Sequence, residues 1–152
     1  MNEKNNQNNS ATFGIKGQYI KDLSFESPNS PESLIASNNQ PRIEVNVELK
    51  ARNLQESLYE TTIFLTARAI IEDKTVFLIE LSYAGIFEIS NIDEKYIEPV
   101  LMIDCPFILF PFARRIIADV TRDGGFPPLM LDPIDFRVLY EQNRTKSSAS
   151  SN

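Results

Sequence analysis

The sequence contains no histidine and no tryptophan, a single cysteine, Cys105, and only five glycines. The absence of histidine excludes an imidazole base, Ser-His-Asp and Cys-His nucleophile systems, and histidine-ligated metal sites. A single cysteine forms neither an internal disulfide nor a cysteine-rich zinc site. The glycines are too scattered to form GxxxxGK[ST] or GxGxxG, so the sequence disfavours ATP-driven and dinucleotide-dependent activity. We therefore expect no catalytic residues, no metal and no cofactor.

Positive charge and long apolar runs are also scarce. Lys and Arg number 15 against 21 Asp and Glu, a net charge of -6 at pH 7, which repels phosphate backbones and anionic lipid. The first ten residues, MNEKNNQNNS, lack the apolar segment of a signal peptide, and no run approaches the roughly 18 apolar residues of a membrane span. We expect no nucleic-acid partner, no membrane insertion and a reducing, cytoplasmic location.

The length of 152 residues is that of one domain. Apolar residues make up 42% and charged residues 24%, close to the globular average, so a packed core is expected. Residues 1–12 are rich in Asn, Gln and Ser, and residues 144–152 are similarly polar. Both ends are predicted to be disordered tails around a domain at residues 13–143.

Four strands are predicted in the first half of the chain. Residues 13–26 and 42–50 alternate apolar and polar side chains, which is typical of half-buried strands, with the odd positions facing inward. Residues 58–71 and 75–87 are rich in β-branched and aromatic side chains and join through a short polar turn, which predicts a hairpin. The Ser-, Pro- and Asn-rich residues 27–41 are predicted to form a long crossover loop.

Helical spacing replaces alternation in the second half. From Leu109 the apolar positions recur as one helical stripe, with Pro111 expected in the first turn and Gly124 as a left-handed C-cap. A second helix is predicted from an N-cap at Asp132 to about Gln142. A short helix is predicted within residues 89–102.

Strands followed by helices predict an α+β fold, with a four-stranded antiparallel sheet and helices packed on one face. The strands at 58–71 and 75–87 carry apolar side chains on both faces. Association between chains is therefore expected, unless the packing of the helices covers all of this surface.

Three segments also carry a family resemblance: YIKDLSFESPNSP at 19–31, FLIELSYAGIFEI at 77–89, and CPFILFPFARRIIADVTRDGGFPPLMLDPIDFRVLY at 105–140. In this order they resemble SecB, a family of bacterial protein-export chaperones, over residues 13 to 142. The resemblance implies an ATP-independent cytosolic holding chaperone, assembled as a homotetramer that is a dimer of dimers. Such a chaperone keeps preproteins unfolded and delivers them to SecA, the ATPase of the secretion pathway.

The resemblance further implies a SecA-binding surface. Asp22, Glu26, Leu78 and Glu80 match the family's flat acidic surface, which receives the zinc-binding C-terminal tail of SecA. From the residues alone, an ordinary solvated strand face is the alternative. Catalysis by Asp22 and Glu26 is rejected, because four strand residues separate them by about 13 Å, beyond the ~5 to 9.5 Å of glycosidase carboxylates.

Binding of unfolded clients is harder to assign to residues. A holding chaperone needs exposed apolar surface and backbone pairing rather than one shaped pocket. The family's client groove involves the second strand, the crossover loop and the final helix. The candidates, each of which could equally belong to the core, are Ile43, Val45, Val47, Phe136 and Tyr140. An adaptor or scaffold of similar fold that binds one defined protein is the alternative to a holding chaperone.

Overall fold

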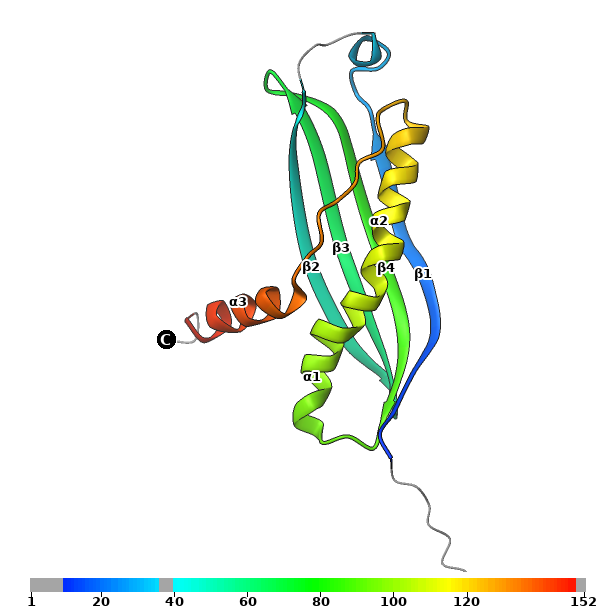
Figure 1. The fold of residues 1–152 in the computed structure, drawn as a ribbon, viewed down its shortest axis with the longest axis vertical. Coiled ribbons are helices and arrows are strands. Elements are labelled where there is room, and N and C mark those ends of the chain that lie inside the picture. The colour runs from blue at the N-terminus through cyan, green and yellow to red at the C-terminus, as the bar shows by residue number, and fades with distance from the viewer. Residues whose placement is uncertain (1–9, 36–39, 150–152) are drawn as a thin grey trace, which may run out of the picture.

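The computed structural model describes residues 10–35 and 40–149. Four strands form one antiparallel sheet in the order β1-β4-β3-β2 (Figure 1). Their bounds are β1 Thr12–Glu26, β2 Arg42–Gln55, β3 Leu58–Ile71 and β4 Lys74–Ser90. The predicted sheet is confirmed, and β1 and β2 are its two edges.

The connections follow the local chemistry of the chain. Glu72 and Asp73 form the turn between β3 and β4, and both have left-handed backbone angles, with φ of 50° and 64°. A two-residue turn of this kind matches the twist of the paired strands. The crossover from β1 to β2 contains a short 3-10 helix, η1 (Glu32–Leu34). It carries the chain from one edge of the sheet to the other.

One helical run follows the sheet and crosses its face along β4 (Figure 1). It comprises η2 (Glu94–Tyr96), α1 (Ile97–Pro99), the π-helical η3 (Val100–Asp104) and α2 (Cys105–Asp123). The helix predicted within 89–102 is therefore present, but it begins at Glu94 because β4 continues to Ser90. The proline in the first turn of α2 is Pro106, and Pro111 lies inside the helix, which corrects the predicted start.

The end of α2 also differs by one residue from the prediction. Gly125, with φ of 91°, takes the left-handed position, whereas Gly124 is still right-handed. The Gly125 N–H donates to Arg122 O at 3.0 Å and the Phe126 N–H donates to Thr121 O at 3.1 Å. This pair of bonds is a Schellman motif, in which a left-handed glycine satisfies the last carbonyl groups.

The final helix, α3 (Phe136–Ala149), begins later and ends later than predicted. The Asp135 carboxylate, not that of Asp132, accepts from the N–H groups of Arg137 and Val138 at 3.1 and 3.2 Å. Residues 144–149, expected in a disordered tail, belong to this helix, since no Gly or Pro stands there to end it. In Figure 1, α3 projects past β2, away from the sheet.

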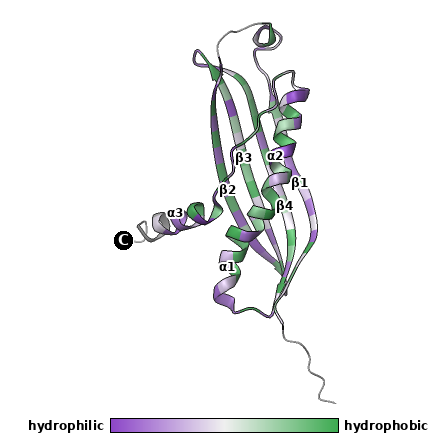
Figure 2. Ribbon diagram, viewed as in Figure 1, coloured by the Kyte–Doolittle hydropathy of each residue, from purple (hydrophilic) through white to green (hydrophobic). Residues whose placement is uncertain are grey.

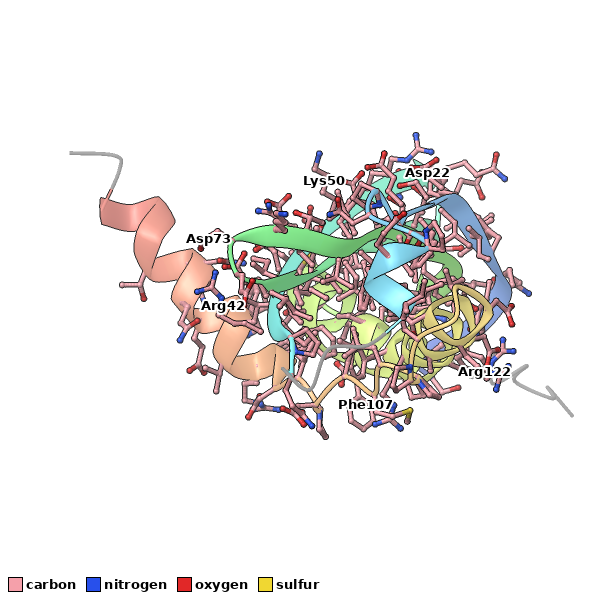
Figure 3. The ribbon with its side chains drawn as sticks, turned by 90° about the horizontal axis from the view of Figure 1, so that it is seen from above. Asp22, Arg42, Lys50, Asp73, Phe107 and Arg122 are labelled. Atoms are coloured by element: carbon pink, nitrogen blue, oxygen red, sulfur yellow. The ribbon has the colours of Figure 1, made fainter. Side chains whose placement is uncertain are left out.

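The core lies between the sheet and the helical run. The odd-numbered residues of β3 and β4 face the helices: Ile63, Leu65, Ile79 and Phe87 are at most 1% exposed. Hydropathy follows this plan, with apolar residues dominating β3 and β4 and polar ones most of α3 (Figure 2). We call the sheet surface away from the helices the open face. Figure 3 separates the two sides, with Asp22 and Lys50 on the open face and Phe107 on the helical side.

Candidate functional site

The open face brings together the four residues assigned to a partner surface. In the β1/β4 register, Asp22 lies opposite Ser82, Ser24 opposite Glu80, and Glu26 opposite Leu78. Paired residues in an antiparallel ladder share a face, so the two acidic residues of β1 flank Glu80 of β4. Asp22, Glu26 and Glu80 are exposed and Leu78 is half-buried. A charged surface with one apolar residue on it is the result.

Two further carboxylates extend this surface across the sheet. Glu44 and Glu48 on β2 lie opposite Arg68 and Phe64 of β3, and all four point to the open face. A shallow depression of about 280 Å³ is lined by Asp22, Glu48, Phe64 and Glu80 among others. The Lys50 ammonium lies over the Phe64 ring, 5.3 Å from its centroid. We call this surface the acidic platform: Asp22, Glu26, Glu44, Glu48, Phe64, Leu78 and Glu80. Alternation within 42–50 places Glu44 and Glu48 on one face, but only the strand order places them across β3 from Glu80.

A nearly buried carboxylate, Glu60 of β3, lies beside the acidic platform on the same face and is 5% exposed. One oxygen accepts a hydrogen bond from the Tyr19 hydroxyl. The other accepts from Lys21 Nζ at 3.1 Å and from Arg52 Nε at 3.0 Å. Because Tyr19 and Lys21 lie on β1 and Arg52 lies on β2, Glu60 ties both edge strands to the centre of the sheet.

The electrostatics of this cluster follow from its donors. Burial acts to raise the pKa of Glu60, but the hydrogen bonds from Tyr19, Lys21 and Arg52 outweigh it and lower the pKa to about 2. Burial and the neighbouring carboxylate raise the pKa of Tyr19 to about 12. At neutral pH the cluster therefore holds an ionised Glu60 and a protonated Tyr19. Glu60 was not among the residues expected to form a site, although a carboxylate inside a strand with two apolar faces indicates a buried polar contact.

The candidate client residues separate into two groups. Ile43, Val45 and Val47 lie on the helical side of β2; Val45 is 46% exposed and the other two are half-buried. Phe136 is 3% exposed and packs edge-on against Phe110, and Tyr140 is 8% exposed. The side chains of β2 are therefore accessible, whereas those of α3 lie beneath the surface of the chain.

Two depressions follow β2 on its helical side. One, of about 570 Å³, lies between the crossover and the segment after α2, with Leu34, Ile43, Phe126 and Leu129 among its lining residues. The other, of about 760 Å³, lies between the far end of β2 and the start of the helical run, lined by Leu49, Tyr59, Ile97, Leu101 and Met102 among others. We call the two depressions with the β2 side chains between them the apolar groove.

Other site chemistry is not evident in residues 10–35 and 40–149. No three His, Cys, Asp or Glu side chains of these residues gather in a group that could hold a metal ion. Nor does any helix in this part of the chain have the length and apolar character needed to cross a membrane. Cys105 is fully buried, and that burial raises the pKa of its thiol to about 12. It is therefore not a reactive thiolate.

Comparison with known protein families identifies the family of this chain. The family model described as preprotein translocase subunit SecB matches residues 6–147, nearly the whole chain. The chain belongs to the SecB family. The predicted resemblance to a family of protein-export chaperones is confirmed.

Individual relatives agree with this assignment. The protein-export protein SecB of Afipia carboxidovorans is 50% identical over 136 residues, which cover 90% of this chain and 84% of that one. SecB of Parvibaculum lavamentivorans is 51% identical over 130 residues, 86% of this chain and 77% of its own. The fold is shared with a Mycobacterium tuberculosis SecB-like chaperone solved with a ChAD peptide of the HigA1 antitoxin. That structure has a TM-score of 0.68 at 16% identity and covers 80% of this chain and 90% of its own.

Proposed function

We propose that the protein is a cytoplasmic holding chaperone that binds unfolded preproteins without ATP and delivers them to the SecA ATPase. The observation that carries the proposal is the separation of two surfaces: the acidic platform lies on the open face and the apolar groove on the helical side. A delivering chaperone needs both, because client and ATPase have to be bound together for transfer.

The apolar groove supports the binding of many different clients. Among its lining residues are aliphatic and aromatic side chains that are mostly half-buried in the single chain, with charged residues such as Lys50 and Glu98 at one end. Apolar side chains of this kind gain free energy from further burial without requiring one partner shape. The edge strand β2 runs along it and has a neighbouring strand on one side only. An extended client can therefore pair with the β2 backbone while its alternate side chains enter the groove. Phe136 and Tyr140 are buried in the single chain and are therefore not offered to a client.

The acidic platform supports the binding of SecA through Asp22, Glu26, Leu78 and Glu80. Several carboxylates on a flat sheet attract a basic segment and speed its association. Leu78, half-buried opposite Glu26, offers an apolar anchor within the charged surface. The additional carboxylates of β2 widen the target beyond the four residues expected from the sequence.

The exposed apolar surface supports assembly as a dimer of dimers. Part of it lies on α2 and β1, whereas most of the apolar side chains of β3 and β4 are buried within the chain. Phe107 and Phe112 of α2 are 70% and 43% exposed, and Ile15 and Ile20 of β1 are 44% and 48% exposed. A second chain can pair with the open edge of β1 and another can cover α2, which gives the two different interfaces that such a tetramer requires.

Light scattering tests the proposed function against that of an adaptor for one protein. Chemically denatured clients of unrelated sequence are diluted into buffer with and without the purified protein, in the absence of nucleotide. A holding chaperone suppresses the aggregation of all of them at near-stoichiometric amounts. Suppression of none would contradict the proposal and favour the adaptor.

SecA delivery makes a separate prediction. The change Glu80→Lys places a positive charge at the centre of the acidic platform, next to Leu78. SecA affinity is expected to fall at least tenfold, about 1.4 kcal/mol, because a basic partner now meets repulsion. Calorimetry with purified SecA measures the affinity, and light scattering measures client holding, which is expected to be unchanged.

The matched control for this variant is Glu141→Lys, the same change of charge at an exposed position of α3. It should leave SecA affinity as in the unmodified protein. Undiminished affinity in Glu80→Lys would mean that the acidic platform is not the SecA site of this protein.

A further inference from the structure

Strand β1 contains two irregularities that decide which side chains reach the open face. Its pairing with β4 passes from Ile15 opposite Phe87 to Gly17 opposite Ile86, and again from Ile20 opposite Tyr83 to Asp22 opposite Ser82. In each step β1 advances by two residues while β4 advances by one. Lys16 and Lys21 are therefore the extra residues of two β-bulges.

The second bulge determines the side on which the end of β1 presents its carboxylates. Ile20 faces the helices, as its partner Tyr83 does, and strict alternation would then place Asp22 on the helical side as well. The extra residue Lys21 shifts the alternation by one, so that Asp22 and Glu26 reach the open face. If the same sequence continued through Lys21 in regular alternation, Asp22 and Glu26 would turn to the helical side, and the acidic platform would lose both of its β1 carboxylates.

The opposite face of the same segment is held independently. Phe25 stacks on Phe77 with ring centroids 6.0 Å apart and lies 6.4 Å from the Phe126 ring. Gly124 also packs closely against Phe25, since a β-carbon at that glycine would overlap the ring. These contacts keep Phe25 on the helical side, so the change in alternation has to occur between Ile20 and Phe25.

Glu60 holds the bulge at Lys21. Its carboxylate accepts from Lys21 Nζ at 3.1 Å and from the Tyr19 hydroxyl, which are the bulged residue and a residue two positions before it. Ala84 of β4 lies opposite Tyr19, and its single methyl group leaves room for both side chains to cross β4 and reach β3. The Glu60 side chain that binds Lys21 is 6% exposed. The corresponding partner of Lys16 in the first bulge, Glu88, has a side chain that is 33% exposed, so its ion pair is more open to solvent.

We propose that Glu60 is a positioning residue for the acidic platform, because by holding Lys21 in the second bulge it keeps Asp22 and Glu26 on the open face. Glu60 does not itself contact the partner in this role. It also retains the Lys21 ammonium, which would otherwise be free to pair with the neighbouring Asp22 and neutralise it. The proposal rests on the proposed function of the acidic platform as the SecA site.

Deletion of Lys21 separates positioning from a general effect on the fold. The change Glu60→Gln alone is expected to lower SecA affinity about tenfold, because the bulge is no longer held. Deleting Lys21 removes the extra residue, so that Asp22 follows Ile20 in strict alternation and reaches the open face without a bulge. The double variant, Glu60→Gln with Lys21 deleted, is therefore expected to bind SecA within about twofold of the unmodified protein.

Glu88→Gln is the matched control, since it removes the ion pair of the other bulged lysine, Lys16, at a distance from the acidic platform. It should leave SecA affinity unchanged. An equal loss of affinity in Glu60→Gln and in the double variant would overturn the positioning role and assign Glu60 to general stability. Unchanged affinity in Glu60→Gln would overturn it as well.

Hydrogen exchange provides a readout that does not depend on SecA. In Glu60→Gln the backbone amides of residues 20–23 should exchange faster, while those of the β3/β4 hairpin keep their protection. Unaltered exchange at 20–23 would overturn the positioning role. A third outcome is faster exchange at 20–23 in Glu60→Gln together with no SecA binding by the unmodified protein. It would support the role of Glu60 in holding the bulge and overturn the proposed function of the acidic platform.

Discussion

Replacing Phe107 and Phe112 together with Asp is expected to divide the assembly, from particles of four chains into particles of two. Both rings lie on α2 and are 70% and 43% exposed in the single chain. Figure 3 places Phe107 on the side opposite the acidic platform. Burial of an exposed phenylalanine side chain at an interface contributes about 1.5 to 3 kcal/mol. A carboxylate in the same place has to be desolvated without a partner.

Two chains are expected to remain together because the edge of β1 is unchanged in this variant. Light scattering coupled to size-exclusion chromatography measures the mass, which should fall from about four times to about twice the subunit mass of 17.3 kDa. Lys95→Asp is the control: it changes the net charge by the same two units, at an exposed lysine outside α2. A double variant that stays tetrameric at micromolar concentration would assign assembly to another surface.

The sequence alone does not reveal which apolar residues, such as Phe107 and Phe112, remain exposed for an interface. Apolar residues on both faces of the strands at 58–71 and 75–87 predicted association between chains through these strands. In the structure Leu81 is 2% exposed and belongs to the core, so a charge there would unfold the chain. Exposed apolar side chains remain on α2 and β1, because the sheet covers only one side of α2, and Ile15 and Ile20 at the edge of the sheet are not covered by the helices.

Alternation predicted β2, β3 and β4 well, because each keeps one register with its neighbours over most of its length. It failed in the middle of β1, where odd positions such as Tyr19 and Lys21 were expected to face inward. Both instead reach Glu60 on the open face. A bulge depends on contacts with residues far away in the sequence, and local periodicity therefore does not reveal it.

The termini of the helices were misplaced by one to seven residues, and for the caps between α2 and α3 the reason is related. Asp132 and Asp135 are both suitable N-caps, and Gly124 and Gly125 are both suitable C-caps. The packing of the segment between α2 and α3 selects one of each: Leu131 is 6% exposed, and the Leu129 N–H donates to the buried Thr121 hydroxyl at 2.9 Å. The chain is held extended across Asp132, and the helix has to begin at the next available cap.

The structure places the four SecA candidates on one surface, because the register between β4 and the last part of β1 puts all four side chains on the open face. Their extension by Glu44 and Glu48 required the order of the strands, which brings β2 beside β3. Of the groove candidates, those on β2 are accessible and those on α3 are buried. Hydrophobic periodicity alone does not distinguish accessible from buried residues, since it indicates only that one side of a strand or helix is apolar.

Truncating the helical side of β2 is expected to weaken client binding about 100-fold. The triple variant Ile43→Ala, Val45→Ala and Val47→Ala removes several methyl and methylene groups from the apolar groove, at positions that are exposed or half-buried in the single chain. With about 0.8 kcal/mol for each group that a client buries fully, and about half of that area available, the loss is about 3 kcal/mol, which corresponds to roughly 100-fold. Fluorescence anisotropy with a labelled unfolded client measures the affinity.

The opposite side of the same strand provides the matched control. Glu44→Ala, Asn46→Ala and Glu48→Ala change alternate positions of β2 that point to the open face. This control is expected to keep client affinity, and to lower SecA affinity because it removes two carboxylates of the acidic platform. Binding of clients should also depend little on salt, since burial of apolar surface is not screened by ions. A folded triple variant with unchanged client affinity would assign Ile43, Val45 and Val47 to the core, and the client site would then lie elsewhere on the chain.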